Sequence, residues 1–358
     1  MDQNKVSRRS FFQRTAILAG TAGAVLSLEE QHLLAQQRGG AGAPPEGRPP
    51  QNGFGPPPSR GPVIPAIPGP IPTVKLGGVE VSRLIAGHNL VVGQAHEGGS
   101  GLIYISSLLT NYFTEPKVLE TFAAYEKNGI NTSGARMADN MLGYTKKYKA
   151  QGGKLQWLAG ISSERDLPMA TEMGAQLGYV HGNTADADLA LPNGTDEIAK
   201  LLDAIRKAKM AGGICAHNLD VIIACEKAGI KPDFYIKTFN NRNFMMTGNG
   251  VPTGITSGVV DAAQKAGAEQ SAKMVKEYMA SVKVPFVGFK TLAAGRVQPA
   301  DALAWSFENG CDAVLVGMYD FQVANNANMT KKILQDRASI KRTRGWFQSQ
   351  ADGSAGAI

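Results

Sequence analysis

The segment from residue 176 to residue 218 constrains the fold more than any other part of this chain. It contains two short apolar runs, QLGYVHGN and GGICAHN, each ending at a histidine followed by glycine or asparagine. Between them, residues 195–210 place apolar side chains mostly at helical spacing, with acids in the first turn and lysines in the last. A strand, a helix and a strand in about forty residues form a βαβ unit, whose strands are parallel. Because parallel strands of a barrel end at one rim, we expect His181 and His217 there.

The same alternation recurs along the chain. Eight short apolar segments are predicted strands, at residues 84–87, 130–133, 155–161, 177–181, 213–216, 233–236, 286–289 and 313–317. Further predicted helices separate them, for example at 115–127, 163–176, 219–228, 269–282 and 299–309. Alternation around Gly77 and Gly78 predicts a β-hairpin ahead of the first strand. The pattern favours an α/β fold, a (β/α)₈ TIM barrel with an N-terminal β-hairpin. A doubly wound open sheet is the alternative, which eight units suit less well.

Composition changes along the chain predict four parts. Residues 1–35 contain SRRSFFQ at positions 7–13, which resembles the twin-arginine export signal; an ordinary basic amphipathic start is the alternative. The apolar stretch that follows is short and weak, so no stable membrane span is expected after cleavage. Residues 36–72 are rich in proline and glycine and predict a disordered linker. The barrel is expected at 73–340 and a C-terminal tail at 341–358. The resemblance implies a periplasmic or other extracytoplasmic location, with the twin-arginine export machinery as a partner.

Charge and cysteine content argue against nucleic-acid binding and against a disulfide framework. The formal net charge is +7, and the first 60 residues carry seven Lys/Arg against four Asp/Glu, which leaves +4 for the remainder. That remainder has no basic cluster with interleaved aromatic residues, so nucleic-acid binding is not supported. The three cysteines lie in apolar runs, which predicts buried thiols and no disulfide framework.

In their order and spacing, several motifs resemble the aldo-keto reductase superfamily. The opening stretch VKLGGVEVSRLIAG is similar to that family's hairpin, which plugs the bottom of the barrel. KNGIN at 127–131 resembles its second strand, and the two histidine-ended runs resemble its fourth and fifth. The resemblance implies a nicotinamide cofactor such as NADP, held at its phosphate end by Gly295, Arg296 and the segment 316–326, which includes Gln322 and Asn326.

The chain departs from that family at the residues that carry its reaction. Reductases of the family use an Asp, a Tyr, a Lys and a His, with the Tyr as proton donor. Here the Asp position falls on about Gly134 and the Tyr position near Asp139, while the third strand ends AGIS without a lysine. Only His181 matches. Without the Tyr and Lys, the family's usual carbonyl reduction has no proton donor.

The rim is therefore interpreted from its own residues. His181, His217 and Lys290 are the candidate catalytic residues, because imidazoles and a desolvated amine titrate near neutral pH. His88, His181 and His217 are candidate metal ligands for a divalent cation, with Glu97 or Asp186 as a carboxylate ligand; hydrogen bonding to loop carbonyls or substrate is the alternative. The candidate substrate-binding residues are His88, Arg136, Asn218, Lys237 and Asn240.

Three functions remain open at this point. The first is an exported enzyme that acts on a small, polar, perhaps carbohydrate-derived substrate. The second is a non-catalytic barrel that binds a small molecule at the same rim. The third is a nicotinamide-dependent oxidoreductase with a relocated proton donor, Tyr144 or Tyr319.

Overall fold

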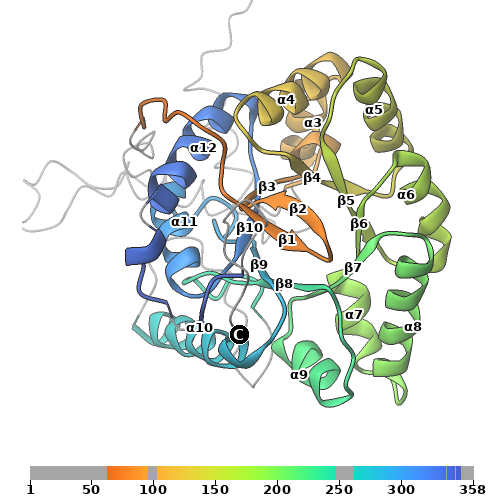
Figure 1. Ribbon diagram of the computed structural model, residues 1–358, viewed down its shortest axis with the longest axis vertical. Helices are drawn as coiled ribbons and strands as arrows, with labels where there is room; N and C mark the ends of the chain where they lie inside the picture. The colour runs from red at the N-terminus through yellow and green to blue at the C-terminus, as the bar shows by residue number, and fades with distance from the viewer. Residues whose placement is uncertain (1–62, 96–102, 247–261, 336, 343, 348–358) are drawn as a thin grey trace, which may run out of the picture. The chain divides into compact units, whose positions relative to one another are not determined.

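Eight parallel strands close into a barrel (Figure 1). The computed structural model describes residues 63–95, 103–246, 262–335, 337–342 and 344–347. The barrel strands are β3 (Leu84–Gly87), β4 (Thr132–Arg136), β5 (Gln156–Ile161), β6 (Leu177–Val180), β7 (Ala211–Ala216), β8 (Phe234–Thr238), β9 (Phe286–Phe289) and β10 (Ala313–Gly317). Each pairs with the next in sequence, and β10 pairs with β3. This order confirms the predicted barrel and excludes the open sheet.

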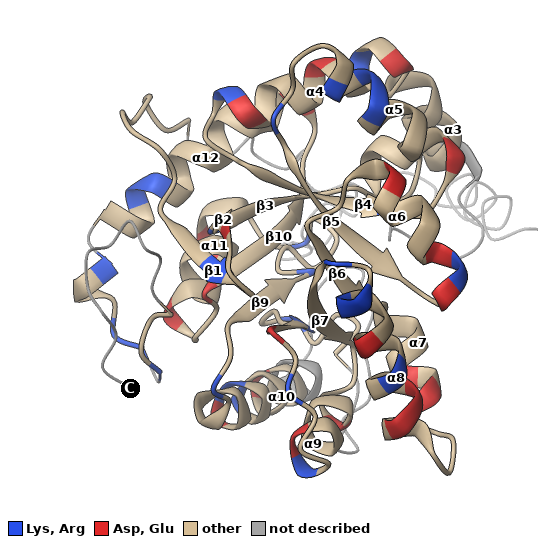
Figure 2. Cartoon of the chain, turned by 45° about the vertical axis from the view of Figure 1, so that its right-hand side comes forward, with Lys and Arg blue, Asp and Glu red and all other residues tan. Residues whose placement is uncertain are grey.

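Helices surround the strands. They are α3 (Ile103–Tyr112), α4 (Glu115–Lys127), α5 (Asp139–Ala150), α6 (Leu167–Met173), α7 (Gly182–Asp188), α8 (Gly194–Lys207), α9 (Leu219–Lys227), α10 (Ala262–Ser281), α11 (Pro299–Glu308) and α12 (Asp320–Gln335), with short 3₁₀ turns at Leu90–Val92, Glu164–Asp166 and Arg337–Ser339. Figure 2 shows both signs of charge along α4, α5 and α8. In α8 the apolar face buries Ile198, Leu202 and Ile205, as its spacing predicts.

The core has two layers. One lies between the sheet and the surrounding helices. The other fills the barrel, where Ile85, Leu158, Cys215 and Ile236 point inward from their strands. These side chains pack with Val74, Leu76 and Val81 of the N-terminal hairpin. The barrel is therefore a packed core rather than a pore, and ligands have access only to its ends.

The N-terminal hairpin covers the amino-terminal end of the barrel. It consists of β1 (Thr73–Leu76) and β2 (Val79–Ser82), joined by Gly77 and Gly78 at φ values of 57° and 91°. A Cβ added to Gly77 would lie 2.6 Å from Ala211 Cβ and 2.9 Å from Asp233 Cβ, so the turn sits against the starts of β7 and β8. Figure 1 shows the hairpin across the centre of the ring of strands. The carboxyl end is the end available for chemistry.

The packed chain extends beyond both predicted barrel boundaries. Ahead of Thr73, Ile71 is buried and the backbone N–H of Ile64 donates to Asn325 Oδ1 at 2.7 Å. The last part of the expected linker therefore lies against α12, because Asn325 satisfies its backbone. The expected export signal at 1–35 and the linker up to residue 62 lie outside the described residues. Within the described part of the chain, no helix is long and apolar enough to cross a membrane.

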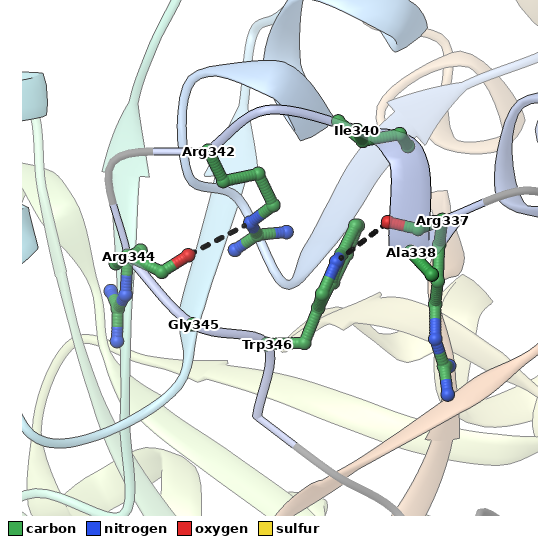
Figure 3. A pocket seen from close by; sticks show the side chains of 7 residues that line it. All are labelled: Arg337, Ala338, Ile340, Arg342, Arg344, Gly345 and Trp346. Carbon is green, nitrogen blue, oxygen red and sulfur yellow. Dashed lines mark hydrogen bonds between the residues drawn. The ribbon is translucent and has the colours of Figure 1, made fainter.

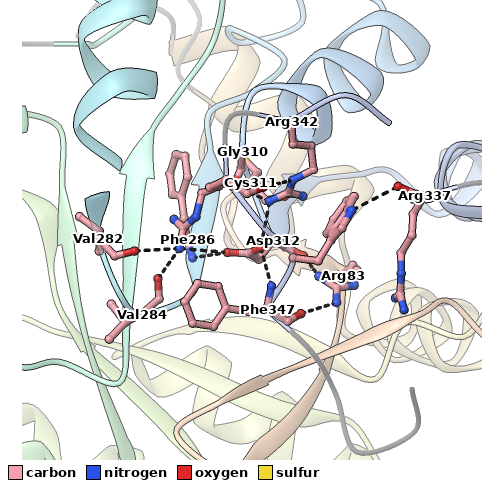
Figure 4. A network of polar contacts seen from close by, with 12 residues as sticks. Arg83, Val282, Val284, Phe286, Gly310, Cys311, Asp312, Arg337, Arg342 and Phe347 are labelled. Atoms are coloured by element: carbon pink, nitrogen blue, oxygen red, sulfur yellow. Dashed lines mark hydrogen bonds and ion pairs between the residues drawn. The ribbon is translucent and has the colours of Figure 1, made fainter. Parts of the chain in front are cut away.

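After Lys341, the expected tail is held by one buried carboxylate (Figure 4). Asp312, which is 0% exposed, accepts hydrogen bonds from the backbone N–H groups of Phe286 at 2.9 Å and Phe347 at 3.3 Å. Its oxygens lie 3.1 Å from Arg342 Nη2 and 3.8 Å from Arg344 Nη2. Arg83 donates to the backbone carbonyls of Asp312 and Phe347 at 2.8 and 2.6 Å. Charge pairing thus ties the tail to the starts of β9 and β10.

This tail also lines a shallow pocket of about 320 Å³ (Figure 3). Arg342 lies over the ring of Trp346 at 3.5 Å and donates to the carbonyls of Cys311 and Gly310, each at 2.9 Å. Arg344 donates to the carbonyls of Val282 and Val284. Because these guanidinium groups bind the chain's own backbone, the pocket is part of the structural base of the barrel.

The Asp312 network generates a stability prediction. Asp312→Asn removes the carboxylate that faces two buried guanidinium groups, and we expect a loss of about 3–5 kcal/mol in the free energy of unfolding. Urea denaturation measures it, with Asp301→Asn, on an exposed position of α11, as the matched control. A loss as small as that of the control would show that the network does not hold the tail.

Candidate functional site

Four polar side chains lie at the carboxyl ends of adjacent barrel strands. His181 follows β6, His217 follows β7, Lys237 lies near the end of β8, and Lys290 follows β9. These strands are neighbours in the barrel. A Cβ added to Gly182 would lie 3.0 Å from His217 Cε1, so the ends of β6 and β7 are in contact. The two histidines therefore share the rim, as the βαβ pattern predicts.

Asp186 holds His217 in one orientation. Its Oδ2 lies 2.8 Å from His217 Nδ1, and the carboxylate also accepts from the backbone N–H of His217 at 3.2 Å and of Asn218 at 3.0 Å. A carboxylate that is ionised can only accept, so the Nδ1 of the neutral imidazole carries the proton. The lone pair is then on Nε2, where the ring can act as a base. The side chain is 8% exposed, which limits other orientations.

His181 has the opposite arrangement of protons. Its Nδ1 accepts from the backbone N–H of Asn183 at 3.3 Å, because His181 is the N-cap of α7. A backbone N–H can only donate, so the neutral ring carries its proton on Nε2. Burial, with the neighbouring charges of His217, Lys290 and Arg136, lowers the pKa of His181 below its usual value. At neutral pH His181 is therefore a neutral hydrogen-bond donor.

Lys237 clamps the end of β7 to β8. Its side chain is 0% exposed, and Nζ donates to the carbonyl oxygens of His217 at 2.6 Å and Thr238 at 3.0 Å. Burial lowers the pKa of Lys237 from 10.5 to about 7, against the opposing charge of Asp186. Asp186 and Lys237 thus fix His217 from its ring and from its carbonyl. The described contacts of Lys237, a predicted substrate-binding residue, are thus to the backbone of two strand ends.

Lys290 lies over an aromatic ring that also contacts His217. Its Nζ is 4.8 Å from the centroid of Phe289, and that centroid is 5.3 Å from the ring of His217. Lys290 has a φ of 55°, in the left-handed region that non-glycine residues seldom adopt. Burial lowers the pKa of its amine from 10.5 to about 8. The side chain remains partly exposed, in contrast to Lys237.

Two glycines in the barrel strands have polar side chains close beside them. A Cβ at Gly134 would lie 2.8 Å from His88 Nδ1, so His88 takes the space beside that strand. A Cβ at Gly160, near the end of the third barrel strand, would lie 2.8 Å from Tyr179 Oη. Burial raises the pKa of Tyr179 well above its usual range, so it stays protonated. A longer side chain at either glycine would therefore require its neighbour to move.

Three predicted substrate-binding residues make contacts within the chain. Arg136 is exposed and its guanidinium donates to Gln94 Oε1. Asn218 Oδ1 accepts from the backbone of Asp220 at 2.8 Å and so caps α9. Asn240 binds the backbone of its own loop through both ends of its amide, including Phe244 N–H and C=O, each at 3.0 Å. Of the three, Arg136 is the one whose side chain is exposed to solvent.

The predicted cofactor residues lie in two places. Gly295 and Arg296 are in a turn after β9, where Arg296 Nη1 donates to the carbonyl of Ala293 at 3.1 Å. Gln322 and Asn326 lie in α12 rather than in a loop; Gln322 Oε1 accepts from the backbone of Tyr319 at 3.1 Å, and Asn326 is buried.

The metal hypothesis for His88, His181 and His217 is not supported by their placement. Among the described residues, no three His, Cys, Asp or Glu side chains come close enough to hold a metal ion. In this arrangement His217 Nδ1 is bound to Asp186, His181 Nδ1 accepts from a backbone N–H, and His88 Nδ1 lies beside Gly134. His96 and Glu97 fall outside the described residues.

Sequence reasoning missed two parts of the site. Asp186 was considered only as a metal ligand, although its position five residues after His181, in the next helix, is compatible with contact to the following strand end. Phe289 was treated only as an apolar strand residue. No signal in the sequence indicates that its ring lies between Lys290 and His217.

The structure is a closed parallel barrel with two differently hydrogen-bonded imidazoles at its carboxyl end. No family model matches the chain, and no curated protein matches it. Solved structures do: an aldo-keto reductase of Pseudomonas aeruginosa is 16% identical, with a TM-score of 0.49, over 73% of this chain and 95% of that one. The holo form of an aldo-keto reductase from Bacillus halodurans is 12% identical, with a TM-score of 0.48, over 78% and 99%. A glycerol dehydrogenase from Gluconobacter oxydans is 11% identical, with a TM-score of 0.44, over 75% and 95%. At these identities the likeness concerns the barrel and not the chemistry of its rim.

Burial of Lys237 generates a prediction about pH and stability. Between pH 7 and 10.5 the unfolded chain binds a proton at this amine that the folded protein does not bind, so stability rises with pH in that window. We expect Lys237 to contribute a gain of about 2 kcal/mol between about pH 7.5 and pH 9, and Lys237→Met should remove this part of the slope and leave the smaller part that comes from Lys290. Urea denaturation at several pH values measures it. Lys200→Met, at a side chain that is 68% exposed, should keep the wild-type slope; an equal slope in Lys237→Met would contradict the burial argument.

Proposed function

We propose that this protein is an enzyme that moves a proton to and from a carbon atom next to a carbonyl group. The observation that carries the proposal is the opposite protonation of the two rim imidazoles. His217 presents a lone pair on Nε2, because Asp186 binds its Nδ1. His181 presents an N–H on Nε2, because a backbone N–H binds its Nδ1. Such a pair removes a proton at one atom and donates a hydrogen bond to the oxygen that gains charge.

The electrostatics of the rim support a small, polar, oxygen-rich substrate. His181 is held neutral, so it donates a hydrogen bond without adding a formal charge. Arg136 is exposed at the end of β4 and Lys290 is partly exposed at the end of β9. Both cations attract the oxyanion, carboxylate or phosphate of a substrate. A carbohydrate-derived hydroxy-carbonyl compound fits these groups, and the reaction class is that of an isomerase, epimerase or lyase.

We also propose that the protein is exported through the twin-arginine route and acts outside the cytoplasm. The proposal rests on the SRRSFFQ motif and on the proline- and glycine-rich segment that follows it. Replacing Arg8 and Arg9 together by Lys should retain the full-length chain in the cytoplasm, as cell fractionation would show. Unchanged fractionation would contradict it.

Proton transfer predicts exchange of carbon-bound hydrogen with solvent. In D₂O the protein should incorporate deuterium next to the carbonyl of at least one compound in a panel of small 2-oxo acids, hydroxyaldehydes and ketoses, followed by ¹H NMR. Asp186→Asn and His217→Gln should each lower the exchange rate by about a hundredfold, because each removes the oriented base.

Asp203→Asn, the same chemical change on an exposed position of α8, is the matched control and should exchange at the wild-type rate. Circular dichroism would establish that the variants fold. Binding of a panel compound without exchange, in folded wild-type protein, would favour a barrel that binds its ligand without reaction.

A further inference from the structure

In the proposed function the amine of Lys290 serves only as a charge near the substrate, and it takes no part in moving the proton. It lies at the end of β9, next to the strand that carries Lys237. The ring of Phe289 lies near both Lys290 and His217. Its centroid is 4.8 Å from Lys290 Nζ and 5.3 Å from the ring centroid of His217. An amine and an imidazole on one aromatic ring can both reach a small substrate.

The two buried amines of the site have different access. Lys237 is 0% exposed and both of its hydrogen bonds go to backbone carbonyls, so no substrate reaches it. Lys290 is partly exposed. Lys290, Ala293 and Ala294 have left-handed backbone conformations, which are unfavourable for residues other than glycine. The packing around them must offset this conformational energy. Backbone strain of this kind is concentrated at functional sites.

We infer that Lys290 is the nucleophile of this rim and that the substrate is an aldehyde or ketone, which it holds as an imine during proton transfer. The inference rests on the proposed function and names the substrate class of the same site. Burial lowers the pKa of Lys290, beside the ring of Phe289, to about 8 and so keeps a useful fraction of the amine neutral near pH 7.

The bonds and protons balance without a further reactant. The neutral amine nitrogen of Lys290 forms a bond to the carbonyl carbon, and the C=O electron pair moves to oxygen, which takes the proton that the nitrogen loses while His181 donates a hydrogen bond to it. A proton from solvent then converts the hydroxyl group to water, whose departure gives the protonated imine. His217 Nε2 takes the proton from the adjacent carbon, and that electron pair moves toward the imine nitrogen. Reprotonation and addition of water release the product and the free amine, with no change of oxidation state overall.

Reductive trapping tests the inference on the full chain. The protein is treated near pH 7 with glyoxylate or pyruvate and cyanoborohydride, and modified lysines are mapped by peptide mass spectrometry. Lys290 should be modified on the order of a hundredfold faster than Lys200 and Lys273, whose side chains are 68% and 71% exposed, because a pKa of about 8 leaves far more neutral amine than one near 10.5. Lys237 should remain unmodified.

Equal modification of Lys290 and the exposed lysines, or preferential modification of Lys237, would overturn the inference. Lys290→Arg keeps the charge but removes the nucleophile, so it should lower the rate of deuterium exchange into the substrate by at least about a hundredfold. If exchange persists in Lys290→Arg while Lys290 is not trapped, the imine is wrong and the proposed proton transfer stands. If Lys290 is trapped but the wild type shows no exchange, the nucleophile is assigned and the proposed proton transfer fails.

Discussion

The carboxylate of Asp186 is the interaction on which the candidate site depends. It binds the ring of His217 at Nδ1 and the two backbone N–H groups at the end of β7, so that one side chain sets both ring orientation and protonation. Lys237 binds the carbonyl of the same histidine from β8. Neither group needs to touch substrate for this effect. Preorganised hydrogen bonds of this kind make a base effective because they need no rearrangement during the reaction.

Glycines at two positions in the barrel strands leave room for side chains from neighbouring segments. At Gly134 the neighbouring space holds His88, and at Gly160 it holds the hydroxyl of Tyr179, so neither position can take a longer side chain without displacing its neighbour. A longer side chain would therefore require a coupled change, at His88 for Gly134 or at Tyr179 for Gly160. A parallel barrel places polar groups at its carboxyl end, and these close contacts limit which side chains fit there.

Much of the fold follows from local signals in the chain. The strands at Leu84–Gly87, Phe286–Phe289 and Ala313–Gly317 and the helix Glu115–Lys127 have their predicted bounds, because apolar runs and helix ends are marked by the sequence itself. The helix at Asp320–Gln335 is not among the predicted helices, because its asparagine-rich composition hides its buried face. The sequence also predicts which residues follow the barrel strands, and so which side chains lie at the carboxyl end of the barrel. The tautomers of His181 and His217 and the burial of Lys237 depend on contacts between segments far apart in sequence, which periodicity does not report.

The two ends of the barrel use buried charge for different purposes. At the amino-terminal end, Arg83, Arg342 and Arg344 bind Asp312 or backbone carbonyls, and the chain gains a closed base. At the carboxyl end, Lys237 and Lys290 are desolvated, and their charged forms are disfavoured. A buried amine with a lowered pKa reduces the stability of the fold at pH values below the amine's unfolded-state pKa. The charged groups at the carboxyl end therefore destabilise the fold, whereas those at the amino-terminal end stabilise it. An amine that costs stability and lies beside an oriented imidazole is explained by reactivity better than by folding.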